Sequence, residues 1–139
     1  MTERELRVAV ATRIAALDAA TWRESAGAPD LVGRLPATAM HGAYSVDVPS
    51  SRVTRGTQRR SMLVEARVLV RFLWRLKPSE GLVSTDAALD AEVALVDHLC
   101  AQWGPVHLLW QDSQRASLDS GDWRLHILTF VSSFYATPS

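Results

Sequence analysis

The sequence predicts an α+β domain, in which a four-stranded, mainly antiparallel sheet carries two helices packed on one face. Two segments repeat apolar residues with the period of a helix, and four segments alternate apolar and polar residues as strands do. Their order along the chain is helix, strand, strand, helix, strand, strand. At 139 residues, the chain is expected to form one domain, residues 1–139, with its own hydrophobic core.

The first helix is expected from about Glu3 to Leu17. Thr2 and Glu5 have the spacing of a capping box, in which each side chain accepts a hydrogen bond from the other residue's backbone N–H. Apolar residues recur every three or four positions, so one side of this helix is expected to face the core. These residues are Leu6, Val10, Ile14 and Leu17.

A long β-hairpin gives the strongest signal in the chain. Its first strand alternates over residues 40–48 and is expected to stop at Pro49, which has no backbone N–H for a ladder. An arginine-rich loop over residues 50–61 follows. The second strand, Met62 to Leu76, alternates for fifteen residues and is expected to return antiparallel to the first. Its apolar face belongs to the core, and its polar face carries Glu65, Arg67, Arg71 and Arg75.

The second strand of this hairpin is too long for a compact domain. At about 3.3 Å per residue, Met62 to Leu76 would reach about 50 Å, whereas a domain of this length is roughly 37 Å across. Either the strand bends at a bulge, or the hairpin projects and its unpaired backbone needs cover from another subunit. We expect a projecting hairpin that is covered in an assembly.

The second helix is expected from about Asp86 to Trp103. Ser84 or Thr85 would cap it, acidic residues lie near the positive end of its dipole, and Gly104 follows its last turn. The face expected to pack on the core consists of Leu89, Val93, Val96, Cys100 and Trp103, widened by Leu95 and Leu99.

Two further strands are expected after this helix. Residues 106–110 alternate as a short third strand, and residues 111–122 form a polar loop. The last strand begins at Trp123 and extends toward Tyr135. Both of its faces are fairly apolar, so we expect it to be central in the sheet.

Charge divides the chain, although the formal net charge is zero. Zero net charge argues against a dedicated nucleic-acid binder. Residues 50–77 hold eight basic residues against one acid, and residues 78–114 hold six acids and no Lys or Arg. The two regions are either solvated faces of opposite sign or the two halves of a head-to-tail contact between subunits. Their candidate residues are Arg52, Arg55, Arg59 and Arg60 on the basic side, and Asp86, Asp90, Glu92 and Asp97 on the acidic side.

No pattern for catalysis or cofactor binding stands out. The four histidines show no metal-ligand spacing, no serine has the setting of a nucleophile elbow, and the seven glycines are too scattered for a phosphate loop. Most of the five tryptophans are expected in the core, with one or two anchoring a subunit contact. We expect no catalytic residue, no metal and no cofactor, and we do not expect an enzyme.

The single Cys100 cannot form an internal disulfide, and it is expected in a reduced interior. The amino terminus is charged and lacks the apolar core of a signal peptide. No stretch approaches the roughly 18 to 20 apolar residues of a membrane span. The sequence therefore predicts a soluble chain with no membrane partner.

The element order, the chain length and the arginine-rich hairpin, with the stretch Val64–Leu76 followed by the acidic helix Asp86–Trp103, resemble the tail terminator proteins of long-tailed bacteriophages. The similarity runs from Glu3 to Tyr135. It implies a virion protein made in the bacterial host cytoplasm, which assembles as a homo-hexameric ring on the head-proximal end of the tail tube. Such a ring stops tube growth and offers a surface to the head–tail connector.

The resemblance also implies that DNA is only a cargo passing through the lumen, and that Arg52, Arg55, Arg59 and Arg60 lie at an inter-subunit or lumenal surface. Two other classes stay open. A head-completion or connector protein of the same particle is the nearer one. A small ligand-binding domain is the more distant, because it requires a deep pocket with converging polar groups.

Overall fold

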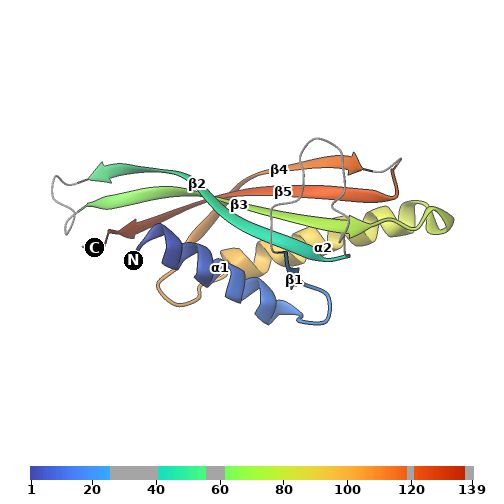
Figure 1. Ribbon diagram of the computed structural model, residues 1–139, viewed down its shortest axis with the longest axis horizontal. Coiled ribbons are helices and arrows are strands. Elements are labelled where there is room, and N and C mark those ends of the chain that lie inside the picture. Colours follow the sequence, from blue (N-terminus) through green and yellow to red (C-terminus); the bar gives the residue numbers. More distant parts are fainter. Residues whose placement is uncertain (26–40, 56–61, 119–120, 137–139) are drawn as a thin grey trace.

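The computed structural model describes residues 1–25, 41–55, 62–118 and 121–136. Over these ranges, two α-helices lie on one face of a five-stranded sheet, as Figure 1 shows. The α+β class is therefore confirmed. The elements are α1 (Glu3–Leu17), β1 (Arg23–Glu24), β2 (Ala43–Arg55), β3 (Leu63–Arg75), the short 3-10 helix η2 (Pro78–Glu80), α2 (Leu82–Cys100), β4 (Leu108–Leu118) and β5 (Trp123–Tyr135).

The sheet has the strand order β1-β2-β3-β5-β4. β1 pairs parallel to β2, and the other three pairings are antiparallel. The prediction of four strands was wrong by one, because β1 has two residues and is too short for alternation to be visible. β5 lies between β3 and β4, so its predicted central position is confirmed.

The first strand of the hairpin does not stop at Pro49. β2 continues to Arg55, and the pairing with β3 shifts register between Asp47 and Ser50. Pro49 lies inside this shift, where it has no paired residue on β3, so its missing N–H removes no ladder hydrogen bond. The predicted loop over residues 50–61 was therefore wrong at its beginning, and its residues 56–61 lie outside the described ranges.

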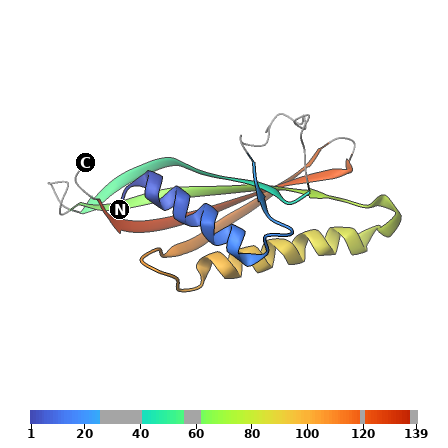
Figure 2. The same cartoon turned by 60° about the horizontal axis from the view of Figure 1, so that its bottom comes forward.

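The long second strand is confirmed as β3, but the described part of the hairpin does not project alone. β3 pairs with β5 along its whole length, from Leu63 opposite Tyr135 to Arg75 opposite Trp123. β2 covers the other side of β3, so a single copy satisfies the backbone of this strand. The structure fits the long strand by being elongated along the strand direction (Figures 1 and 2).

β4 replaces most of the predicted polar loop over residues 111–122. It pairs with β5 from Leu108 to Leu118, with a register shift between Trp110 and Asp112. Within the described ranges, β4 has β5 as its one neighbour and is mostly exposed. An exposed edge strand tolerates polar residues on both faces, and the register shift breaks the alternation. The sequence of β4 therefore looks like that of a polar loop.

The main core lies between the sheet and the two helices, which Figure 2 shows side by side under the strands. The capping box of α1 is confirmed, because Thr2 Oγ1 accepts from the Glu5 N–H and Glu5 Oε2 accepts from the Thr2 N–H, each at 3.2 Å. The Tyr44 hydroxyl on β2 donates to the Ala11 carbonyl of α1 at 3.0 Å. Together these contacts fix α1 against the hairpin.

The second helix differs from its prediction at both ends and in the face that it buries. α2 begins after Gly81, which makes no side-chain cap, and the Ser84 hydroxyl instead accepts from the Lys77 N–H at 3.0 Å. Val93, predicted to face the core, is 56% exposed. The buried residues of α2 are Ser84, Ala88, Glu92, Leu95 and Leu99.

Candidate interaction surfaces

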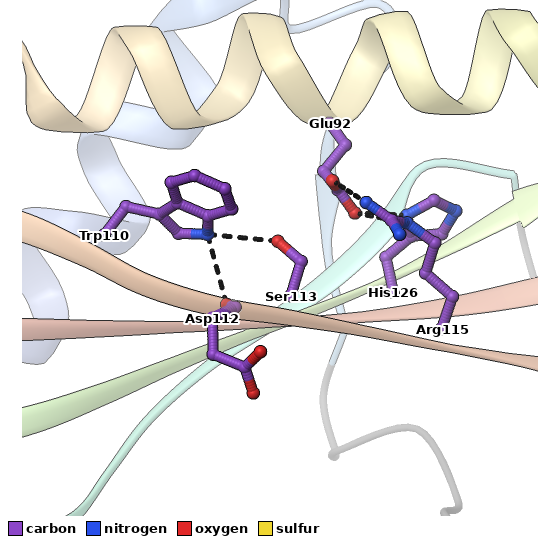
Figure 3. A network of polar contacts seen from close by, with 6 residues as sticks. All are labelled: Glu92, Trp110, Asp112, Ser113, Arg115 and His126. Carbon is purple, nitrogen blue, oxygen red and sulfur yellow. Dashed lines mark hydrogen bonds and ion pairs between the residues drawn. The ribbon is translucent and has the colours of Figure 1, made fainter.

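Glu92 was predicted on an exposed acidic face, and that prediction was wrong. Its side chain is 5% exposed and points from α2 toward the sheet (Figure 3). Arg115 on β4 donates from Nε to Glu92 Oε1 at 3.1 Å and from Nη2 to Oε2 at 2.5 Å. His126 on β5 places Nδ1 at 2.8 Å from the same Oε1. One carboxylate therefore joins α2 to two strands.

The interior holds this polar cluster because its charges are paired. The His126 ring is fully buried and stacks on Phe72 with centroids 4.5 Å apart. Burial lowers the pKa of His126, the hydrogen bond and charge of Glu92 oppose this shift, and the positive charges of Arg124 and Arg115 add to it. Burial alone would raise the pKa of Glu92, but the hydrogen bonds and charges of Arg115 and His126 outweigh burial and lower it.

These pKa shifts predict that acidification destabilises the fold. His126 binds a proton less readily in the folded state than in the unfolded chain, whose ordinary histidine pKa is 6.5, so the free energy of unfolding falls as the pH drops below 6.5. His41, whose pKa is also lowered by burial, adds to the same window. Glu92 adds a further loss as the pH falls below its ordinary 4.5.

Denaturant unfolding between pH 8 and pH 4 measures this dependence. We expect a plateau above about pH 6.5 and a steady loss of stability below it. In the His126→Gln variant the slope between about pH 6.5 and pH 5 becomes shallower, and His41→Gln serves as the comparison for the half-exposed histidine. Unchanged stability of the wild type from pH 7 to pH 5 contradicts the prediction.

The predicted basic residues are placed only in part. Arg52 and Arg55 are exposed on the far half of β2, whereas Arg59 and Arg60 lie outside the described residues. Arg52 is already paired within its own copy, since its Nη2 lies 2.9 Å from Glu65 Oε1 on β3. This pair is largely solvated, with the Arg52 side chain 74% exposed, and contributes little to stability.

The remaining predicted acidic residues form an exposed row on α2, which we call the acidic stripe: Asp86, Asp90 and Asp97. Spacings of four and seven residues place them on one side of the helix, opposite the buried residues Leu95 and Leu99. The acidic stripe therefore faces away from the sheet.

The sheet face away from the helices carries a second row of charge, which we call the arginine row: Arg67, Arg71 and Arg75 on β3. Val68 and Val70, between them in sequence, are fully buried in the core under the helices. Because side chains alternate along a strand, the arginine row points to the opposite side. That side is also partly apolar, since a second cluster buries Ala43, Leu73, Leu118 and Leu125 there.

Of the five tryptophans, Trp22 is buried, three are partly buried against the core clusters and Trp110 is exposed, while the predicted subunit contact stays a prediction. Trp22 is 5% exposed and packs edge-to-face on Phe72, with ring centroids 5.0 Å apart. Trp110 on β4 is 50% exposed, and its indole N–H donates to the Asp112 carbonyl at 3.1 Å and to Ser113 Oγ at 3.0 Å (Figure 3). The indole donor is thus satisfied within the strand, which leaves the ring as an exposed apolar surface.

An open hollow of about 330 Å³ lies on the face of the arginine row and is lined by residues that include Ser50, Arg52, Arg67 and Val131. The described residues include no group of three or more His, Cys, Asp and Glu that would hold a metal ion. Among them, no helix has the length and apolar character needed to cross a bilayer.

No protein-family model and no curated protein matches the sequence. The fold, by contrast, is similar to that of a chain in the solved structure "Virion of native gene transfer agent (GTA) particle". The TM-score is 0.51 at 16% sequence identity, and the match covers 92% of this chain and 92% of that chain. The two chains share a fold over nearly their whole lengths.

Proposed function

We propose that this protein is a structural component of a phage-like particle, with no catalytic role. Within that class, it is a tail terminator, which forms a ring on the head-proximal end of the tail tube. The observation that carries the proposal is the fold similarity to a chain of a gene transfer agent virion over 92% of both chains. The element order and length on which the sequence resemblance to tail terminators rests agree with it.

The surfaces of the fold support a role in assembly. The acidic stripe and the arginine row are outer surfaces of opposite sign on one small subunit, and exposed Leu109 and Trp110 lie on β4. The carboxylate at the centre of the most distinctive polar cluster, that of Glu92, is buried and paired with Arg115 and His126. It holds elements together and offers no open cleft to a substrate.

In the proposed particle, the partners are other copies of this chain in a hexameric ring, the tail tube protein and the head–tail connector proteins. DNA passes through the lumen as cargo. The protein acts in the virion, at the head-proximal end of the tail, after synthesis in the bacterial host cytoplasm.

Particles produced without this protein test the role. For a tail terminator, electron microscopy is expected to show tails of variable and excessive length that lack heads, with normal length restored by the wild-type chain in trans. Tails of normal length beside unattached, filled heads would overturn termination and indicate a connector or head-completion protein. Normal, complete particles would overturn both roles.

A further inference from the structure

The acidic stripe and the arginine row carry charges that their own copy does not neutralise. Within the described ranges, the ion pairs between acidic and Lys or Arg side chains join Arg52 to Glu65, Lys77 to Glu80 and Arg115 to Glu92. No such pair there involves either row. The three carboxylates on α2 and the guanidinium groups of exposed Arg67 and Arg75 are therefore available to a partner. Arg71 is half-buried and its Nε is enclosed, and Arg75 has a ring contact, 5.9 Å from the centroid of Trp123.

Each row is accompanied by apolar side chains. On the outer side of α2, Leu82, Val83 and Val93 are 79%, 68% and 56% exposed, which is unusual for a solvated helix face. On β3, the arginine row alternates with Leu69, which is partly exposed, and with Leu73, which is buried in the second cluster. A surface that mixes unpaired charge with exposed apolar groups, as the outer side of α2 does, is typical of a contact between proteins.

The two surfaces also agree in length. The acidic stripe, Asp86 to Asp97, covers about 17 Å of helix at about 1.5 Å per residue, and exposed Leu82 and Val83 extend this surface to about 22 Å. Arg67 to Arg75 covers about 26 Å of strand at about 3.3 Å per residue. The helices cover one face of the sheet (Figures 1 and 2), and the acidic stripe lies on the outer side of α2 in that layer. The arginine row lies on the opposite face of the sheet, away from the helices. One copy cannot bring its own two surfaces together.

We propose that the acidic stripe of one copy docks on the arginine row of the next copy. The contact joins two different patches, so it is heterologous and repeats from subunit to subunit until it closes into a ring. It rests on the proposed function in that it supplies the subunit contact which a tail ring needs. Asp47 on β2 and Asp112 on β4 lie on the same sheet face and flank the arginine row.

Two double variants test this contact. The helix-face variant carries Asp86→Arg and Asp90→Arg, and the sheet-face variant carries Arg67→Glu and Arg75→Glu. Arg4→Glu, an exposed reversal on α1 outside both rows, is the matched control. Sedimentation of each full-length chain is measured up to about 1 mM, where a contact with a dissociation constant of about 1 mM is half occupied, and thermal melting checks that each variant folds.

The wild type and the control are expected to associate with rising concentration and to dissociate in about 0.5 M salt, which screens charge. Each double variant alone associates at least about tenfold more weakly, because like charges then face each other. A mixture of the two variants is expected to associate again, because the intact sheet face of one variant meets the intact helix face of the other, and the two reversed faces also carry opposite charges.

A wild type that stays monomeric up to this concentration overturns the proposed contact. So does a double variant that associates like the wild type, or a mixture of folded variants that associates no better than either variant alone. These outcomes are separable from failure of the proposed function. Overlong tails in particles without the protein, together with unaffected double variants, would leave tail termination standing and remove only this interface.

Discussion

Replacing Phe72 with alanine is expected to lower the free energy of unfolding by about 3–5 kcal/mol, a large part of the total stability of a domain of this size. Phe72 is fully buried on β3, between β2 and β5. Its ring packs edge-to-face on Trp22 and stacks on His126, with ring centroids 5.0 Å and 4.5 Å away. The substitution therefore opens a cavity where the hairpin meets the rest of the sheet.

Thermal and denaturant unfolding measure this effect, with an expected fall in melting temperature of roughly 10–20 °C. Tyr135→Ala is the matched control, because Tyr135 is also an aromatic residue on a long strand but is 61% exposed. We expect the control to change stability by less than about 1 kcal/mol. Equal losses in the two variants would contradict the assignment of Phe72 to the centre of the core.

Replacing Glu92 with alanine is expected to lower the free energy of unfolding by about 3 kcal/mol, the lower end of the range for breaking a buried ion pair. The Arg115 guanidinium then loses its carboxylate, and its side chain is 34% exposed, so water compensates in part. His126 loses the acceptor of its Nδ1 and remains fully buried.

Asp90→Ala on the same helix is the control for Glu92→Ala, because Asp90 is exposed. We expect it to change the free energy of unfolding by no more than about 0.5 kcal/mol.

A double-mutant cycle that combines Glu92→Ala with Arg115→Ala isolates the interaction between these two side chains. The double variant is expected to lose less stability than the sum of the single variants, since neither charge is then left unpaired. Additive losses would contradict the coupling of the two side chains.

The periodic elements were predictable from local patterns. The first helix has the predicted bounds, Glu3 to Leu17, because its capping box and apolar stripe are both local features. The long strand was equally clear, since one face of β3 is continuously buried. The start of β4 falls in the predicted third strand, but residues 111–118 of β4 and the far half of β2 were missed, because edge strands need neither regular alternation nor freedom from proline.

The prediction of a projecting hairpin was wrong, because the length of the strand was compared with the diameter of a domain assumed to be roughly spherical. β5 matches β3 over thirteen residues, so two long hairpins lie side by side and cover the strand within one copy. That match depends on tertiary pairing. The charged rows, and not an uncovered strand, are therefore the surfaces through which the proposed assembly would form.

The polar cluster was missed because Glu92 was judged by its charge instead of its position. Ala88, Glu92, Leu95 and Leu99 follow one another at spacings of three or four residues, so Glu92 lies on the buried side of α2. That spacing is readable in the sequence. Its partners Arg115 and His126 come from strands distant in sequence, and only the fold brings them together.

Binding of the purified chain to purified tail tubes tests the central claim most directly. Negative-stain electron microscopy is expected to show one ring-shaped disc on one end of each tube, and tubes treated in this way no longer elongate when tail tube protein is added. Discs bound to isolated head connectors and never to tubes, or tubes that elongate as fast with the chain as without it, would contradict a role in ending the tail.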